Sequence, residues 1–239
     1  MKNTVQFKLP VERLSQFRRF IKKFHPEAIP WPGSVFYNKI SQTSIFQQNY
    51  KELAKDITGY CDTGRILDVG TGPGWLLIHL HRSSPLLRLY GIDASSSMVE
   101  KALKNILEQR LSGEIDVEVG SADQIPYDDN FFDCVVSTGS LHHWKDPVAA
   151  INEIYRVLKP DQYALLYDIA SDTPRSVLDE AGRSFGRMRV FLLWIHAFME
   201  PFYSQEQFSL LPSDTLFIHG SAEFVGVMYC LVLQKQLVA

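Results

Sequence analysis

Three glycines at alternate positions, Gly70, Gly72 and Gly74, form the feature that most restricts how this chain can fold. A short apolar run leads into them through Asp68, and an apolar helical pattern begins directly after them. Glycine lets a backbone turn sharply and lets a ligand approach closely, because the residue has no Cβ. A turn between a strand and the N-terminus of a helix is where α/β folds bind nucleotide-like ligands. The segment therefore predicts an α/β fold with a ligand site at this turn.

Apolar and polar stretches alternate regularly after residue 60. Strands separated by helices form right-handed crossovers, so this order predicts a parallel sheet with helices on both faces. The apolar periodicity predicts strands at 65–69, 87–92, 115–119, 132–137 and 162–169, and helices at 11–24, 42–58, 75–82, 95–111, 147–158 and 175–200.

The C-terminal part departs from this alternation. Two apolar runs, 216–219 and 225–234, are separated by a link too short for a crossover helix, so they predict an antiparallel hairpin. No linker divides the chain, which predicts a single domain. Its expected parts are an N-terminal helical extension (1–60), a ligand-binding half (61–170), a helical aromatic-rich segment (171–215) and the terminal hairpin (216–239).

Composition and charge exclude several classes of protein. The 239 residues carry a net charge of −3, which gives no general attraction to nucleic acid. Basic residues do cluster at 18–23 and 175–189, but such runs are more often solvated faces, and nucleic acid remains a weak alternative. The most lipid-like stretch, 190–199, is too short to span a bilayer. The cysteines are scattered without metal-ligand spacing, which predicts no metal site and a reducing, cytoplasmic compartment.

Three carboxylates narrow the choice of ligand. The glycines follow a G-x-G-x-G pattern, whereas the dinucleotide fingerprint, which serves a pyrophosphate, has its third glycine one residue later. Asp68 would repel a pyrophosphate and suits a ligand that carries an ammonium group. Asp93 ends the second strand and can accept hydrogen bonds from two ribose hydroxyls, although it could also simply begin a helix. Asp123 can accept from the amine of a purine, but taken alone it is better explained as part of a polar loop.

Residues 64–170 resemble the class I S-adenosylmethionine-dependent methyltransferases, and among them the small-molecule group called type 11 or UbiE-like. ILDVGTGPG resembles motif I of that family, LYGIDASSSMVEKA resembles motif II, and VGSADQIPYDDNFFDCVVSTGSLHHWKDP resembles the third and fourth motifs. The segment INEIYRVLKPDQYALLYD resembles the following helix and strand. The resemblance implies a Rossmann-like, doubly wound α/β fold whose seven-stranded sheet is mostly parallel with an antiparallel seventh strand. It also implies S-adenosyl-L-methionine as cofactor and S-adenosyl-L-homocysteine as product.

The same resemblance implies which residues contact the cofactor. Pro73 departs from the family pattern, since it removes an amide donor from the loop, but it also stiffens the turn. The implied contacts are Asp68, Gly70, Thr71, Gly72 and Gly74 for the methionine part, Asp93 for the ribose, Ala94 and Met98 for the adenosine, Ala122 and Asp123 for the adenine, and Thr138 and Gly139 near the sulfonium.

Two histidines are the candidates for catalysis. Methyl transfer is an in-line displacement that depends largely on alignment, and it needs a base only if the acceptor must lose a proton. His142 and His143 follow the fourth predicted strand, at the edge of the sheet where ligands bind. Either imidazole is a candidate base, and the alternative, which is favoured for each residue taken singly, is a pair of structural loop histidines.

Segments rich in aromatic residues are expected to determine which acceptor the protein binds. Such segments commonly fold over a cofactor as a lid, and they would enclose a flat or apolar acceptor. A helix-to-sheet core or a dimer face explains the same aromatic residues equally well. The candidate acceptor or lid residues are Trp31, Tyr37, Trp144, Trp194 and Phe198.

The sequence thus predicts a methyltransferase that uses S-adenosylmethionine and acts on a small, apolar or aromatic molecule. Two other classes stay open: a cofactor-binding protein without catalysis, and a nicotinamide-dependent oxidoreductase, which the glycine spacing, Asp68 and the terminal hairpin disfavour. The acceptor atom is not predicted, and the oligomeric state is left as monomer or homodimer.

Overall fold

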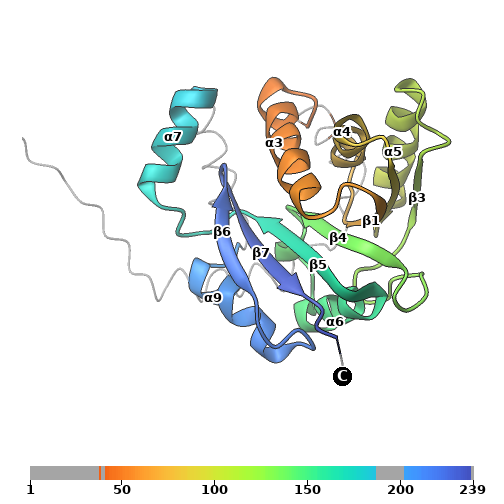
Figure 1. Cartoon of the computed structure of the whole chain (residues 1–239). Coiled ribbons are helices and arrows are strands. Elements are labelled where there is room, and N and C mark those ends of the chain that lie inside the picture. The colour runs from red at the N-terminus through yellow and green to blue at the C-terminus, as the bar shows by residue number, and fades with distance from the viewer. Residues whose placement is uncertain (1–37, 39–40, 187–201, 238–239) are drawn as a thin grey trace, which may run out of the picture.

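The computed structural model describes residues 38, 41–186 and 202–237, and a seven-stranded sheet forms its centre (Figure 1). The order of strands across the sheet is β3-β2-β1-β4-β5-β7-β6. The first five strands run parallel, whereas β7 is antiparallel to both β5 and β6. This arrangement confirms the predicted fold class. The strands are β1 (Gly64–Val69), β2 (Leu87–Asp93), β3 (Ile115–Val119), β4 (Phe132–Thr138), β5 (Leu158–Asp168), β6 (Ser221–Val225) and β7 (Met228–Gln234).

Helices cover both faces of the sheet, with α3, α4 and α5 on one face and α6 and α9 on the other (Figure 1). Strand β1 lies between β2 and β4, and its Ile66, Leu67 and Val69 are almost fully buried, as expected of a parallel strand covered on both faces. The helices are α3 (Ser44–Tyr60), α4 (Trp75–Ser83), α5 (Ser96–Glu108), α6 (Pro147–Val157), α7 (Arg175–Phe185) and α9 (Gln205–Leu210), with the 3₁₀ turns η1 (Leu141–His143) and η2 (Leu211–Asp214).

The predicted position of the hairpin is wrong, although its antiparallel pairing is confirmed. Residues 216–219 form no strand, and β6 is built from residues that had been assigned mainly to the link. The turn lies at Gly226, whose φ of 60° suits a glycine. Leu216 and Ile218 are exposed, while Phe217 between them packs edge-on against Tyr155. The run is apolar, but only one of its large side chains enters the core.

Other predicted boundaries shift by a few residues. Strand β5 begins at Leu158 instead of 162, and β4 continues to Thr138. The helix predicted at 11–24, and the part of the 175–200 helix beyond residue 186, lie outside the described residues. In the parts of the chain that the structure describes, no helix has the length and apolarity needed to cross a membrane.

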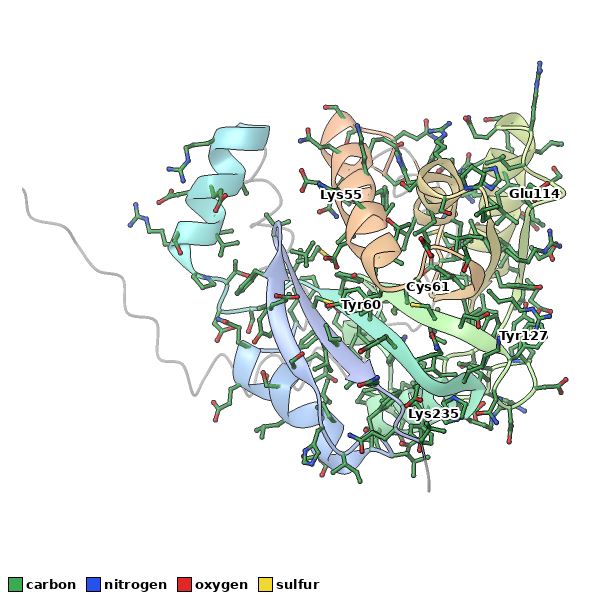
Figure 2. The ribbon with its side chains drawn as sticks, viewed as in Figure 1. Lys55, Tyr60, Cys61, Glu114, Tyr127 and Lys235 are labelled. Atoms are coloured by element: carbon green, nitrogen blue, oxygen red, sulfur yellow. The ribbon has the colours of Figure 1, made fainter. Side chains whose placement is uncertain are left out.

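A lysine ties the end of the sheet to the end of a helix. Lys235 follows β7 and is 8% exposed (Figure 2). Its ammonium donates to the backbone oxygens of Tyr155 and Leu158, both at 2.8 Å, and to Asn130 Oδ1 at 2.7 Å. A cation beside the last carbonyls of α6 also interacts favourably with the helix dipole. The contact fixes the position of β7 against the α6–β5 junction.

We expect Lys235→Met to lower the free energy of unfolding by about 1–3 kcal/mol, because it removes the ammonium donor from one buried and one partly buried carbonyl. Urea denaturation followed by circular dichroism measures this change. Lys104→Met is the matched control, since its side chain is 74% exposed and its contact with Glu108 is 3.9 Å long. That variant should change stability by less than about 0.5 kcal/mol. Equal effects for the two variants would contradict the anchoring role of Lys235.

Candidate active site

The loop between β1 and α4 packs tightly against two other elements. Gly70 and Gly74 have φ values of 77° and 76°, in the left-handed region that favours glycine. A Cβ on Gly70 would lie 2.5 Å from the side chain of Ser140, and a Cβ on Gly74 would lie 3.1 Å from Cβ of Ala102 on α5. The glycines therefore allow both the turn and the close approach of the neighbouring backbone.

Asp93, at the end of β2, joins this loop to the start of α5. Its Oδ2 accepts from the backbone N–H of Gly72 and its Oδ1 from that of Ser95, both at 2.8 Å. Burial raises the pKa of Asp93, and these two N–H groups counteract the rise. Each carboxylate oxygen keeps a further lone pair, so Asp93 can still accept hydrogen bonds from a ligand.

Asp68 lies beneath the loop and is fully buried. No hydrogen bond of normal distance and angle reaches its carboxylate oxygens or the Thr71 hydroxyl from the described residues. Burial raises the pKa of Asp68 to about 7, the nearby Thr71 hydroxyl counteracts the rise, and the nearby Asp93 adds to it. A buried carboxylate without partners is costly for the folded chain. Its position under the glycine loop suits the approach of a cationic ligand group.

Asn105 also supports the loop, and the sequence interpretation missed it. Its side-chain amide is buried on α5 and donates to the Pro73 carbonyl at 2.8 Å and to Asn38 Oδ1 at 3.1 Å. Trp75 Nε1 donates to the same Asn38 oxygen at 3.3 Å. The sequence did hold a signal for this residue, because Asn105 is the one amide side chain among the buried apolar residues of α5. Asn105 thus holds the loop through Pro73, the residue that departs from the family pattern.

The end of β4 forms the opposite wall of the site. Ser140 Oγ donates to the carbonyl of Val69 at 3.1 Å, which joins this wall to the glycine loop. The two candidate histidines then occupy different environments. His143 lines the pocket, whereas His142 is 4% exposed and its Nδ1 lies 2.8 Å from Asp168 Oδ2. The structure therefore does not bring His142 to the pocket surface.

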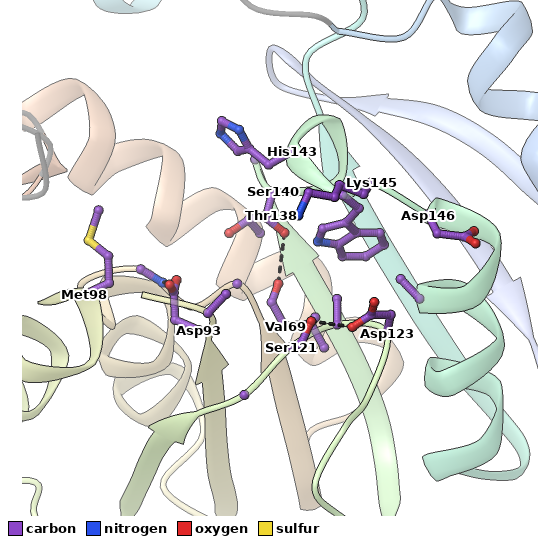
Figure 3. Close-up of a pocket in the computed structure, with 18 residues that line it drawn as sticks. Val69, Asp93, Met98, Ser121, Asp123, Thr138, Ser140, His143, Lys145 and Asp146 are labelled. Carbon is purple, nitrogen blue, oxygen red and sulfur yellow. Dashed lines mark hydrogen bonds between the residues drawn. The ribbon is translucent and has the colours of Figure 1, made fainter. Parts of the chain in front are cut away.

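These walls line a pocket at the carboxyl ends of the strands, the edge at which α/β folds bind ligands (Figure 3). Predicted residues that line it are Gly70, Gly72, Asp93, Ala94, Met98, Ala122, Asp123, Thr138, Gly139, His143 and Trp144. Four predicted residues, Asp68, Thr71, Gly74 and His142, do not line it. Trp31, Tyr37, Trp194 and Phe198 lie outside the described residues. Lining residues that were not predicted are Val69, Gly120, Ser121, Ser140, Lys145, Asp146 and Ala150.

Most of the residues missed in the lining lie within two positions of a predicted one, whereas Ala150 is a buried residue of helix α6. Ser121 is an example, because its hydroxyl donates to the carboxylate of Asp123 across a short turn (Figure 3). Asp146 is another, and its Oδ1 accepts from Ala149 N at the start of α6. The described residues hold no group of three or more His, Cys, Asp or Glu side chains that could bind a metal.

Comparisons with known proteins identify the domain. Residues 67–166 match the family model described as a methyltransferase domain, Methyltransf_11. A protein of Geotalea daltonii, named ubiquinone/menaquinone biosynthesis C-methyltransferase UbiE, is 30% identical over 148 residues, which cover 62% of each chain. The protein of the same name from Geotalea uraniireducens is 26% identical over 199 residues, covering 82% of this chain and 81% of that one.

A solved structure supports the same conclusion. It is a protein of Methanococcus maripaludis, provisionally described as an S-adenosyl-L-methionine-dependent methyltransferase, with a TM-score of 0.69 and 27% identity. The match covers 87% of this chain and 94% of that one. The mostly parallel seven-stranded sheet with its antiparallel β7 is the one that the resemblance to class I methyltransferases implied. Residues 67–166 of the chain thus form a methyltransferase domain, and the chain is similar over most of its length to a protein named UbiE and to a protein described as an S-adenosylmethionine-dependent methyltransferase.

We expect Gly70→Ala to weaken S-adenosylmethionine binding at least about tenfold, because a left-handed backbone costs an L-residue about 1–2 kcal/mol and the new Cβ meets Ser140. Isothermal titration calorimetry measures the dissociation constant. Gly59→Ala on α3 is the matched control, since nothing lies within 4 Å of its added Cβ. That variant should bind the cofactor as the wild type does. Unchanged affinity in Gly70→Ala would contradict the assignment of the loop.

We also expect cofactor affinity to rise with pH through about 7, because Asp68 ionises there and, if it serves the predicted role, its carboxylate would attract the cofactor's ammonium group. Binding at pH 6 should be about tenfold weaker than the plateau, since one pH unit below the pKa leaves about a tenth of the carboxylate ionised. Asp68→Asn should bind weakly and lose this dependence, whereas the exposed Asp123→Asn should keep it. Calorimetric titrations between pH 6 and 7.5 give the comparison.

The raised pKa of Asp68 also affects the stability of the ligand-free protein, which should fall as pH rises. The folded-state pKa of Asp68 is above its ordinary value, so the folded state favours the protonated acid and loses this advantage as pH rises through about 7. Asp68→Asn should therefore gain in melting temperature over the wild type at pH 8 and gain clearly less at pH 5, because the penalty grows from the ordinary pKa of 3.8 up to about 7. A gain of the same size at both values would show that ionisation of Asp68 is not the cause.

Proposed function

We propose that this chain transfers a methyl group from S-adenosylmethionine to a small apolar or aromatic molecule. The observation that carries the proposal is the continuity of the pocket. It runs from Asp93 and Met98 on the cofactor side to Thr138 and His143 at the end of β4. A pocket that joins the two sides can hold an acceptor next to the cofactor.

The cofactor side has residues for each part of the donor. Asp93 would accept from the ribose hydroxyls, with Ala94 and Met98 against the adenosine. Ala122 and Asp123 would contact the adenine. When bound, the cofactor supplies a methyl group on a sulfonium, which is a good electrophile without further activation.

The remaining contacts would orient the charged end of the donor. Asp68 would attract its ammonium through the glycine loop, where Gly70, Thr71, Gly72 and Gly74 shape the backbone. Thr138 and Gly139 would lie near the sulfonium. The unpaired, buried carboxylate of Asp68 supports this orientation, because it lacks a cation that the donor can provide.

The acceptor side is aromatic and polar. Trp144 lines the pocket, is 8% exposed and offers a flat apolar surface. The two UbiE relatives are named as C-methyltransferases of quinone biosynthesis, which supports an aromatic ring as acceptor. His143 would accept the proton of an acceptor that must lose one. Trp31, Tyr37, Trp194 and Phe198 remain predicted acceptor or lid residues.

Two alternatives are weighed against this function. A nicotinamide-dependent oxidoreductase is opposed by the buried Asp68 beneath the loop, where a pyrophosphate would be repelled. A cofactor-binding protein without catalysis would show tight binding and no turnover. The described free cysteines, Cys61, Cys134 and Cys230, are all buried, which is compatible with the proposed cytoplasmic location.

We expect S-adenosylmethionine to raise the melting temperature of the purified protein and NADH to leave it unchanged. Binding at a ligand concentration of one hundred times Kd stabilises the folded state by about 2.7 kcal/mol. With methyl-labelled cofactor, label should pass to phenols or hydroquinones and not to RNA. Stabilisation by NADH alone would overturn the proposal, and tight cofactor binding with no labelling across phenols, amines, thiols and carboxylates would favour the non-catalytic alternative.

A further inference from the structure

A buried histidine–carboxylate pair lies directly behind the pocket. Asp168 ends β5 and is 1% exposed, and His142 lies in η1 and is 4% exposed. His142 Nδ1 is 2.8 Å from Asp168 Oδ2 and 3.1 Å from Oδ1. The backbone N–H of His142 also donates to Oδ2 at 3.1 Å. The carboxylate thus fixes both the ring and the backbone of His142.

The ring of His142 is also packed between two others. Its centroid is 4.0 Å from that of His143, with planes inclined by 41°, and 4.2 Å from that of Phe202. His143 itself lines the pocket and lies beside Ser140 in Figure 3. A chain of direct contacts therefore runs from Asp168 through His142 to His143. Neither Asp168 nor His142 reaches the pocket surface.

Stability alone does not explain such a pair. A buried polar pair loses its hydration, and replacement by apolar side chains of similar volume is often neutral or stabilising. The pair does impose a geometry, since a carboxylate on one ring nitrogen fixes the tautomer and orientation of an imidazole. Here that oriented ring is the surface against which His143 packs.

We propose that Asp168 and His142 are positioning residues that hold the imidazole of His143 toward the acceptor. This role rests on the proposed function, because the orientation of His143 matters only if it acts on the acceptor. Asp168 touches neither substrate nor cofactor and works through His142. His142, one of the two predicted catalytic residues, becomes part of the support for the other.

The test is a double-mutant cycle on methyl transfer. We expect His143→Ala, Asp168→Asn and His142→Gln each to lower kcat about tenfold or more, with cofactor Kd changed less than about threefold. Asp168→Asn added to His143→Ala should cost little further, because the residue through which it acts is already absent. Losses that multiply in the double variant would overturn the proposal, as would wild-type kcat in His143→Ala.

Tyr167→Phe is the matched control. Tyr167 precedes Asp168 in β5, is 1% exposed, and donates to Asp56 Oδ2 at 2.7 Å among the buried residues of the α3 face. The substitution therefore breaks a hydrogen bond of similar length on the other side of the sheet, between a buried tyrosine and a partly buried carboxylate. We expect it to lower the melting temperature without changing kcat. An equal fall of kcat in Tyr167→Phe would show that general loosening of β5, and not positioning, is responsible.

A spectroscopic measurement separates failure of this inference from failure of the proposed function. The imidazole resonances of His143, assigned by comparison with His143→Ala, should move in the cofactor-free Asp168→Asn and His142→Gln variants and stay in place in Tyr167→Phe. Unmoved resonances in folded variants would overturn the positioning role whether or not an acceptor is found. If the His143 resonances move but no tested acceptor is methylated, the proposed function is contradicted, while the coupling of Asp168 and His142 to His143 is established.

Discussion

The site depends on one carboxylate that holds two chain segments together. Asp93 accepts from the backbone N–H groups of Gly72 and Ser95, which lie in the chain on either side of helix α4 and strand β2. The contact sets the glycine loop against the start of α5. Asn105 of α5 holds the same loop by a second hydrogen bond, which it donates to the Pro73 carbonyl. With the loop fixed, the pocket keeps its shape between β2 and β4.

Asp68 shows the cost of such a site. Its carboxylate is buried beneath the loop without a hydrogen-bond partner among the described residues, and burial raises its pKa to about 7. A neutral residue would burden the fold less, because desolvation penalises the charged form. The arrangement resembles other functional sites in which local stability is given up for a charge at the right place. Here the charge suits the ammonium group of the cofactor.

Particular residues show how far the sequence could lead. The alternation of apolar stretches predicted the fold, the glycine spacing and the carboxylates at 68 and 93 narrowed the ligand, and the resemblance of residues 64–170 to a known family implied the cofactor, because each of these signals lies in consecutive residues. The hairpin was misplaced, since the apolar run at 216–219 contains Leu216 and Ile218, which face solvent. The two adjacent histidines could not be told apart in the sequence, and only the packing against Asp168 separates His142 from His143.

The sequence by itself determined the alternation of strands and helices, the left-handed glycine turn and the chemistry of the ligand, because these follow from residues close together in the chain. The tertiary structure decided which side chains meet: Asp93 with Gly72 across 21 residues, His142 with Asp168 across 26, and Asn105 with Pro73 across 32. Such contacts depend on the order of strands in the sheet and on which side chains the helices bury. Local patterns carry no record of that order, so the supporting residues of the site became visible only in the folded chain.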